Sequence, residues 1–255
     1  MRLLLGLVGL LVALSGRAEE NEWRPPFITT PAEVVERMLQ VAETRADDLV
    51  IDLGSGDGRI VIAAAQKYGA RAVGIELDGA LVQKSREAAR AAQVADKVSF
   101  IEGDVLRADI SRATVITIYL LPDLMRQLQP RFIQELAPGT RIVSHAFTMA
   151  GWAPDRSETV KVKERHPGQG DESRLHLWIV PADVRGVWRG PGMEVRIEQN
   201  FQSLDIEGAS RAVISGRNIT WEVGGARFSA RVDGNHMAGE VFVMGASRPF
   251  ALTRN

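Results

Sequence analysis

Three glycines with acidic neighbours form the most distinctive short segment of this 255-residue chain. Gly54, Gly56 and Gly58 follow an apolar run of strand length, residues 49–53, and precede an apolar helical stretch at 60–68. Glycine at such a strand-to-helix turn lets the backbone bend tightly and lets a ligand approach without a Cβ in the way. The segment therefore predicts a small-molecule site.

The spacing and charges of this loop favour a cationic ligand over a dinucleotide. A dinucleotide-binding fingerprint requires a third glycine where Arg59 stands, so a nucleotide-dependent oxidoreductase is disfavoured. Asp52 and Asp57 flank the loop, and carboxylates attract a cation but repel a diphosphate. S-adenosylmethionine fits these constraints, because it has no phosphate and carries an ammonium and a sulfonium group.

Two further carboxylates follow the next two predicted strands. Glu76 lies in a strand at 71–77 and can accept hydrogen bonds from both ribose hydroxyls, while Asp104 follows a strand at 97–102 and can accept one from the adenine amino group. Asp52 can orient the glycine loop or meet the methionine ammonium. Taken singly, each acid could instead cap a helix or face solvent. Together they predict a ligand site at the carboxyl edge of an open α/β sheet.

The elements that must position these residues alternate between helix and strand, which predicts a mostly parallel sheet. Thr30, Pro31 and Glu33 predict a capping box at the start of the first helix, and Asp123 is expected to cap the helix at 123–136. The last strand can return antiparallel. The seven expected strands are residues 49–53, 71–77, 97–102, 114–120, 140–147, 158–163 and 174–180.

A second module is expected after the alternating region. Apolar residues recur at every second position in short segments of residues 186–255, and Gly224-Gly225 and Asp233-Gly234 between them suit hairpin turns. This pattern predicts a small antiparallel barrel or sandwich of about six strands. Such a module could bind a lipid, a peptide or the substrate, or simply pack on the first domain.

Composition excludes several classes of site. The chain has no cysteine, which rules out disulfides, thiolate zinc sites and cysteine nucleophiles. Lys and Arg total 31 against 32 for Asp and Glu, so no nucleic-acid partner is expected. A group of potential metal ligands lacks convincing spacing, so no metal is expected and a solvated loop is favoured for it. Its members are His166, Asp171, Glu172 and His176. Core or edge packing is expected for Trp152, Trp178, Trp188 and Trp221.

The amino terminus has the pattern of a secretory signal. A short cationic start precedes an apolar run at residues 3–14, and small residues follow near position 18. Twelve helical residues span about 18 Å, well short of the roughly 30 Å of a bilayer core. We therefore expect export, to the periplasm in a bacterium, with membrane anchoring through residues 3–14 or a buried amino-terminal helix as alternatives.

The stretch from Asp52 to Arg59 resembles the first motif of the class I, seven-β-strand S-adenosylmethionine-dependent methyltransferases. More narrowly, residues 27–154 are similar to the lysine methyltransferases related to those acting on the ATP synthase c subunit and the adenine nucleotide translocase, including bacterial relatives. The other supporting stretches are Thr30-Pro31-Ala32-Glu33-Val34-Val35, Gly74-Ile75-Glu76-Leu77, Tyr119-Leu120-Leu121-Pro122, Ser144-His145-Ala146-Phe147 and Trp152-Ala153-Pro154. The resemblance implies a Rossmann-like sheet with helices on both faces.

The same resemblance implies roles for individual residues. A segment at Thr30-Pro31 closes the cofactor cleft, and Tyr119 orients or deprotonates the acceptor, unless it is a strand-end aromatic packed under the loop. His145 is expected to be a hydrogen-bonded strand histidine and not a catalytic one. Phe27 and Thr29 depart from the tyrosine and proline common in the family. The expected cofactor-binding set is Thr30, Pro31, Asp52, Gly54, Ser55, Gly56, Gly58, Glu76, Asp104 and Tyr119.

These observations divide the chain into a signal peptide (1–18), an amino-terminal lead or lid segment (19–29), a methyltransferase domain (30–181) and a β-rich carboxyl-terminal module (186–255). The predicted function is transfer of a methyl group from S-adenosylmethionine to a protein lysine or another amine by in-line displacement. The sequence also leaves open that the methyl acceptor is a small molecule and that the protein has a membrane-proximal partner. The alternative is an exported binding protein whose β module binds a ligand or partner while the α/β domain is not catalytic.

Overall fold

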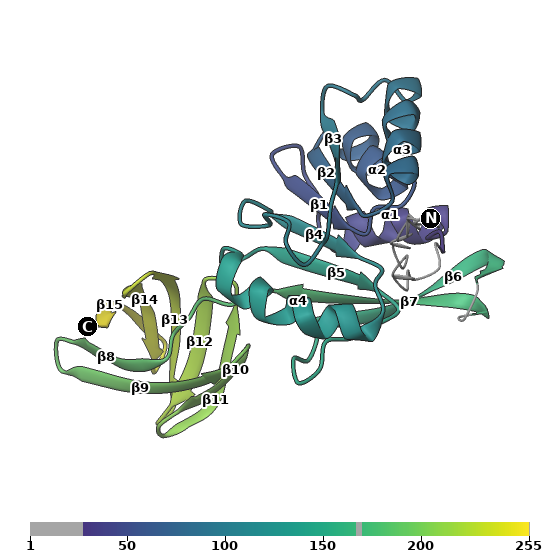
Figure 1. The fold of residues 1–255 in the computed structure, drawn as a ribbon. Helices are drawn as coiled ribbons and strands as arrows, with labels where there is room; N and C mark the ends of the chain where they lie inside the picture. Colours follow the sequence, from purple (N-terminus) through teal and green to yellow (C-terminus); the bar gives the residue numbers. More distant parts are fainter. Residues whose placement is uncertain (1–27, 167–169, 255) are drawn as a thin grey trace, which may run out of the picture.

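The computed structural model describes residues 28–166 and 170–254, and these fold around two β-sheets (Figure 1). The predicted signal at 1–18 and most of the lead segment lie outside the described residues. Among the helices of the described ranges, none combines the length and the apolar character needed to cross a bilayer.

The first sheet has seven strands in the order β3-β2-β1-β4-β5-β7-β6. Strands β1 to β5 are parallel, while β7 is antiparallel to both of its neighbours, β5 and β6. The predicted sheet and its antiparallel last strand are therefore confirmed. The strands are β1 (Leu49–Leu53), β2 (Arg71–Glu76), β3 (Val98–Glu102), β4 (Val115–Ile118), β5 (Arg141–His145), β6 (Arg156–His166) and β7 (Gly170–Ile179).

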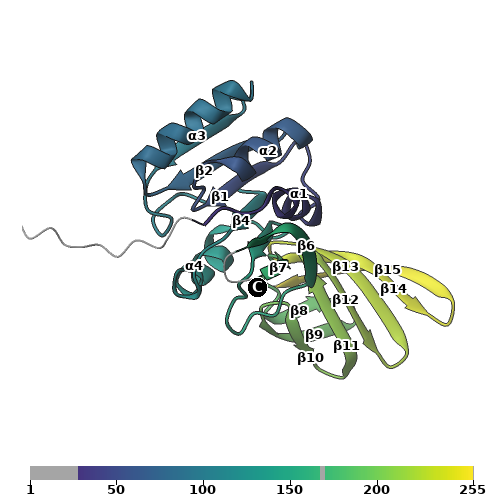
Figure 2. The same ribbon diagram turned by 90° about the vertical axis from the view of Figure 1, so that its right-hand side faces the viewer.

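Helices cover both faces of this sheet, as Figure 2 shows. Side chains alternate between the faces, so Val50 of β1 packs with the first three helices while Ile51 packs with the fourth. Both clusters are buried, and together they hold the strand ends in place. The helices are α1 (Ala32–Val41), α2 (Arg59–Tyr68), α3 (Gly79–Ala91) and α4 (Pro122–Glu135).

The predicted capping box at the start of α1 is wrong. Pro31 is the N-cap residue and the helix start has no side-chain cap. The hydroxyl of Thr30 lies 3.4 Å from Nδ1 of His145 on β5, and Glu33 accepts the Lys163 backbone N–H of β6 at 2.7 Å. Both side chains have partners on the sheet, and these replace the local bonds of a capping box.

The predicted cap of α4 is also wrong. Leu121 is the N-cap residue, Pro122 occupies the first turn, and Asp123 forms an ion pair with Arg126 at 2.5 Å. Proline is pre-organised for the first helical position, so the helix begins one residue earlier than expected. Asp123 still lies in the first turn, where the helix dipole favours a negative charge.

The second sheet is a meander of eight strands that nearly closes into a barrel (Figure 1). Consecutive strands pair antiparallel except at a seam between β10 and β11, and the first strand, β8, pairs with the last, β15. The predicted barrel is confirmed, with eight strands in place of about six. The strands are β8 (Gly186–Gly190), β9 (Met193–Asn200), β10 (Ser203–Ile206), β11 (Ala209–Ser215), β12 (Asn218–Val223), β13 (Ala226–Asp233), β14 (His236–Val243) and β15 (Ala246–Arg254).

Aromatic and aliphatic side chains fill the inside of this barrel. Trp188 and Trp221 are buried, and the ring of Trp221 stacks on Phe228 with centroids 4.7 Å apart. Trp152 and Trp178 are buried in the first domain. The expectation that these four tryptophans serve packing is confirmed.

The barrel meets the first sheet at the amino ends of its parallel strands. Phe201 stacks on Trp152 with ring centroids 5.0 Å apart, and Ala182 donates its N–H to the Gly216 carbonyl at 2.7 Å. Gly216 approaches so closely that a Cβ there would lie 3.1 Å from the Cα of Gly139. Because Gly139 precedes β5 and Trp152 precedes β6, this junction lies away from the carboxyl edge of the sheet.

Candidate active site

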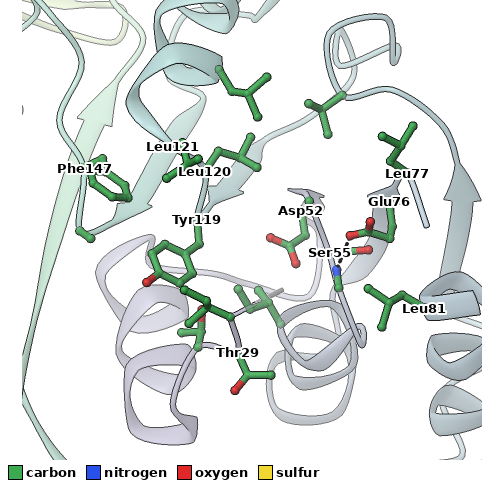
Figure 3. A pocket seen from close by; sticks show the side chains of 18 of the residues that line it. Thr29, Asp52, Ser55, Glu76, Leu77, Leu81, Tyr119, Leu120, Leu121 and Phe147 are labelled. Atoms are coloured by element: carbon green, nitrogen blue, oxygen red, sulfur yellow. Dashed lines mark hydrogen bonds between the residues drawn. The ribbon is translucent and has the colours of Figure 1, made fainter. Parts of the chain in front are cut away.

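A cavity of about 1090 Å³ opens at the carboxyl edge of the first sheet (Figure 3). Its lining follows the strand order along that edge, at about 4.8 Å per strand. Each of six neighbouring strands contributes a residue to the lining. In spatial order along the edge, these are Asp104 after β3, Glu76 on β2, Asp52 on β1, Tyr119 after β4, Phe147 after β5 and Arg174 on β7. The cavity is therefore an elongated site across six strands.

The carboxylate of Glu76 is held on both oxygens by backbone donors. Oε2 accepts the N–H of Gly56 at 2.8 Å, a bond drawn in Figure 3, and Oε1 accepts the N–H of Asp78 at 3.0 Å. Each oxygen keeps further acceptor capacity. Glu76 can therefore accept the two hydroxyls of a ribose without having to move.

The glycines of the loop serve different purposes. Gly54 has φ +79°, and a Cβ there would lie 2.8 Å from Leu120 in the cavity wall. Gly58 has φ +78°, and a Cβ there would lie 2.6 Å from the Phe100 ring. Gly58 is not among the described residues that line the cavity. The structure thus gives Gly58 a packing role, and Pro31 likewise does not line the cavity. Direct cofactor contact by these two residues stays a prediction.

Ser55 lines the cavity, and its backbone N–H joins that of Gly54 in donating to the Ile75 carbonyl, each at 2.9 Å. Its buried hydroxyl has no hydrogen-bond partner within the described part of the chain. The hydroxyl lies over Gly74, because a Cβ on Gly74 would lie 2.5 Å from the hydroxyl oxygen. Gly74 therefore makes room for Ser55, and the loop keeps its shape.

Asp52 is a buried carboxylate, only 2% exposed. Burial raises its pKa to about 7; the hydrogen bond from the Thr117 hydroxyl, 2.7 Å long, acts in the opposite direction, and the charges of Glu76 and Asp57 raise the pKa further. A cationic ligand would favour the ionised form. Asp52 can therefore meet an ammonium group in the centre of the cavity.

Arg59 ties the glycine loop to the segment before α1. Its guanidinium binds both oxygens of Asp57, at 2.6 and 2.9 Å, and donates to the Thr30 carbonyl at 2.8 Å. Burial would raise the pKa of Asp57, but the bond and charge of Arg59 outweigh it, so that pKa lies below its ordinary value. Because Ile28, Thr29 and Thr30 line the cavity, this contact holds one of its walls.

Asp104 also lines the cavity, but one of its oxygens has a local role. Oδ1 accepts the N–H of Leu106 at 2.9 Å in a turn after β3, and Oδ2 lies 3.8 Å from Arg107. The carboxylate is about two-fifths exposed. A ligand can still approach Oδ2, and recognition of adenine by Asp104 stays a prediction.

Tyr119 and Phe147 form the aromatic side of the cavity, away from Glu76, as Figure 3 shows. The Tyr119 ring lies 4.1 Å from the His145 ring and 6.4 Å from the Phe147 ring, measured between centroids. His145 is fully buried and its Nδ1 faces the Thr30 hydroxyl, so the expected hydrogen-bonded strand histidine is confirmed. These contacts fix the tyrosine ring at the end of β4.

Two residues of β7 complete the cavity, and neither belongs to the cofactor-binding or catalytic residues expected from the sequence. Glu172 and Arg174 line it from the sheet, and the solvated loop expected around Glu172 is wrong because β7 begins at Gly170. The alternating pattern of residues 171–177 is the available signal. His176 on the same strand lies 2.8 Å from the Ser157 hydroxyl. Within the described ranges, no group of three His, Asp or Glu side chains could hold a metal ion.

Acidic residues dominate the charge of the cavity. Among the residues that the structure describes, seven carboxylates line it against two guanidinium groups, which attracts cations and repels phosphate groups. The carboxylates belong to Asp52, Asp57, Glu76, Asp78, Asp104, Asp123 and Glu172, and the guanidinium groups to Arg59 and Arg174. This set suits S-adenosylmethionine, since the anchored Glu76, the Cβ-free loop and the buried Asp52 fit a ribose and two cationic centres.

A parallel sheet with one antiparallel strand between β5 and β6, and a cavity at its carboxyl edge, define the class I methyltransferase fold. Residues 52–156 match the family model described as ANTKMT methyltransferase domain. A protein-lysine N-methyltransferase of Saccharolobus islandicus is 41% identical over 140 residues, which cover 54% of this chain and 86% of that protein. The chain belongs to this family of S-adenosylmethionine-dependent methyltransferases.

Two further similarities bear on the acceptor. The lysine N-methyltransferase of the ATP synthase c subunit from Homo sapiens is 36% identical over 130 residues, covering 51% of this chain and 55% of that protein. The chain thus spans little more than half of that relative's length. A solved structure of an RNA methyltransferase from Salinibacter ruber with S-adenosyl-L-homocysteine is 48% identical, covers 62% of this chain and 96% of that one, and has a TM-score of 0.56.

Proposed function

We propose that this protein transfers the methyl group of S-adenosylmethionine to the side-chain amine of a protein lysine. The observation that carries the proposal is the cavity at the carboxyl edge, which joins an acidic half on β1 to β3 to an aromatic half after β4 and β5. When bound, the cofactor supplies an electrophilic methyl group on a sulfonium. The chain has to align an amine with that methyl group and exclude water.

The acidic half is built to hold the cofactor. Glu76 accepts hydrogen bonds from the ribose hydroxyls, Asp52 meets the ammonium group, and Asp104 accepts from the adenine amino group through its freer oxygen. The contact between Arg59 and the Thr30 carbonyl keeps the segment before α1 over the site. This assignment rests on the family and on the anchored geometry of Glu76.

The aromatic half is built to receive an amine. A lysine has a pKa of about 10.4, so removing its proton at neutral pH costs roughly 4 to 5 kcal/mol. The Tyr119 hydroxyl is our candidate to orient the amine or to accept that proton, since His145 and Phe147 hold its ring at the cavity. Tyr119 is therefore the proposed catalytic residue.

A protein acceptor is favoured over RNA. The relative from Saccharolobus islandicus is named a protein-lysine methyltransferase, whereas the structure from Salinibacter ruber is described as an RNA methyltransferase. The excess of carboxylates around the cavity opposes the approach of a phosphate backbone and favours a cationic side chain. RNA is the competing acceptor that the experiment has to exclude.

Calorimetric titration of the full chain with S-adenosylmethionine and S-adenosyl-L-homocysteine tests the cofactor. We expect micromolar binding that Gly56→Arg abolishes, because the new side chain fills the site. Methyl-labelled cofactor is then offered with lysine-containing protein, with small amines and with RNA. Label on a protein lysine supports the proposal, whereas label on RNA or on small amines alone overturns the acceptor assignment.

We also propose that the protein is exported, on the sequence of residues 1–18 alone. An exported methyltransferase needs a supply of its cofactor outside the cytosol. Amino-terminal sequencing of the protein from its native host is the test, and an intact Met1 on a cytosolic species would rule out a cleaved signal.

A further inference from the structure

We propose that Glu172 recognises the positive charge of the incoming acceptor, so that β7 sets the specificity of this site for a cationic substrate. The inference rests on the proposed function and adds to it a residue that discriminates between charged and neutral acceptors. Three observations support this role: the position of Glu172 on the sheet, the absence of a hydrogen bond or ion pair to its carboxylate among the described residues, and the charges around it.

Strand β7 extends past the end of β5 at the mouth of the cavity. The pairing of the two strands ends at His145 with Leu175, followed by one bond from the Ala146 N–H to the Arg174 carbonyl at 2.8 Å. Glu172 lies two residues further along and pairs only with Lys161 of β6. Its side chain is exposed at the cavity, on the same face of β7 as Arg174.

The order of strands puts Glu172 on the acceptor side of the cavity. The carboxylates assigned to the cofactor lie on or after β1, β2 and β3, and Tyr119 follows β4. Strand β7 is two strands beyond β4, about 10 Å along the edge. Tyrosine and glutamate side chains can approach each other across that distance, so a lysine moving toward Tyr119 passes Glu172.

Glu172 also differs from most other acids of the cavity, because the described residues give its carboxylate no hydrogen bond or ion pair, although Lys161 lies opposite it on β6. Glu76 and Asp104 accept backbone N–H groups, and Asp57 is paired with Arg59. Within the described residues, the Glu172 carboxylate forms no hydrogen bond and no ion pair. An exposed carboxylate without a partner at the wall of a cavity is available to a ligand ammonium.

The charges around Glu172 determine what removing its carboxylate would do to a cationic ligand. Arg174 lies between Glu172 and the end of β5 and carries the opposite charge, while Asp123 at the start of α4 is already paired with Arg126. Without Glu172, this wall loses its carboxylate while Arg174 stays on the same face of β7. Glu172 therefore supplies negative charge on the β7 wall of the cavity, where it favours a cation.

The test measures peptide binding to the full chain saturated with S-adenosyl-L-homocysteine. Two probes are used, acetyl-Gly-Lys-Gly-amide and the same peptide with uncharged norleucine. We expect the wild type to prefer the lysine peptide. Glu172→Gln should lower the affinity for that peptide about tenfold, or about 1.4 kcal/mol, and should leave the affinity for the norleucine peptide unchanged. Glu172→Asp should retain most of the preference.

Asp171→Asn is the matched control, because Asp171 is an exposed neighbour on the same strand that points to the other face and does not line the cavity. Its lysine-peptide affinity should stay within twofold of the wild type. Equal binding of the lysine peptide by wild type and Glu172→Gln overturns the inference, as does a wild type that does not distinguish lysine from norleucine. Failure to bind S-adenosyl-L-homocysteine overturns the proposed function, and this inference with it.

Discussion

The Glu76 carboxylate and the Gly56 N–H are joined by a 2.8 Å hydrogen bond, which connects the end of β2 to the glycine loop after β1. The second Glu76 oxygen is held by the Asp78 N–H. The loop and the carboxylate therefore fix each other's position before any ligand arrives. Such pre-organisation lowers the entropic cost of binding.

Replacing Glu76 with glutamine tests this arrangement. The glutamine amide would turn an N–H donor toward one of two backbone N–H groups, so Glu76→Gln loses at least one charge-assisted bond. We expect S-adenosyl-L-homocysteine affinity to fall about tenfold to hundredfold by calorimetry, with the fold intact by circular dichroism. Glu102→Gln, at the end of β3 outside the cavity lining, is the control and should bind normally.

The raised pKa of Asp52, about 7, predicts opposite effects of pH on binding and on stability. If Asp52 meets the ammonium group as proposed, its ionisation above pH 7 creates the charge for that contact, so S-adenosylmethionine affinity should rise about threefold to tenfold from pH 6 to 8. Asp52→Asn should flatten this profile. A wild-type affinity that is constant across this range would contradict the assignment.

The effect of Asp52 on stability has the opposite sign. The folded pKa lies above the unfolded value, so the native state binds the extra proton, and the stability this provides is lost as pH rises through about 7. Asp52→Asn should therefore raise the melting temperature relative to the wild type more at pH 8 than at pH 5. Thermal unfolding at the two pH values provides the check.

Gly54→Ala and Gly58→Ala separate the two purposes of the loop. Both positions have positive φ, but the new Cβ would meet Leu120 at 2.8 Å in the first case and the Phe100 ring at 2.6 Å in the second. We expect Gly58→Ala to cost about 1 to 3 kcal/mol of stability while its folded fraction still binds the cofactor. Gly54→Ala should lose cofactor affinity as well, as calorimetry alongside denaturant unfolding will show.

Tyr119→Phe removes one hydroxyl and keeps the ring against His145 and Phe147. If the hydroxyl orients or deprotonates the acceptor, single-turnover methyl transfer to a lysine peptide should slow about 100-fold or more. Affinity for S-adenosyl-L-homocysteine should stay within about twofold of the wild type. An unchanged rate would leave Tyr119 as a packing residue only.

The stack of Trp152 on Phe201 predicts energetic coupling between the two domains. A double-mutant cycle with Trp152→Leu and Phe201→Leu should give an interaction energy of about 0.5 to 1.5 kcal/mol in chemical unfolding. The same cycle between Trp221 and Phe201, which are not stacked, is the comparison. Simple additivity in the Trp152 cycle would show that the stack contributes nothing to the junction.

Local patterns in the sequence predict most of the first sheet and the acidic half of the cavity. Asp52 and Glu76 lie directly at strand ends, and a parallel sheet brings such positions to one edge. The predicted capping box fails because the partners of Thr30 and Glu33 lie on β5 and β6, more than a hundred residues away. No local pattern contains those contacts.

The remaining differences have a similar physical origin. The sequence favours a solvated loop around Glu172, whereas β6 and β7 are antiparallel neighbours whose pairing includes Lys161 with Glu172 and His166 with Gly170. In the barrel, β10 has four residues, and β15 is largely exposed and contains Pro249, so neither has a strong alternating pattern. Their strand structure depends on neighbours that a single sequence does not identify.

In the barrel, Thr253 and Arg254 of β15 pair with Arg189 and Trp188 of β8. The first and last strands of this module are therefore neighbours, and the short segment between β7 and β8 connects the module to the first sheet. A unit with this topology has all of its strand pairing within itself and shares no strand with the first sheet.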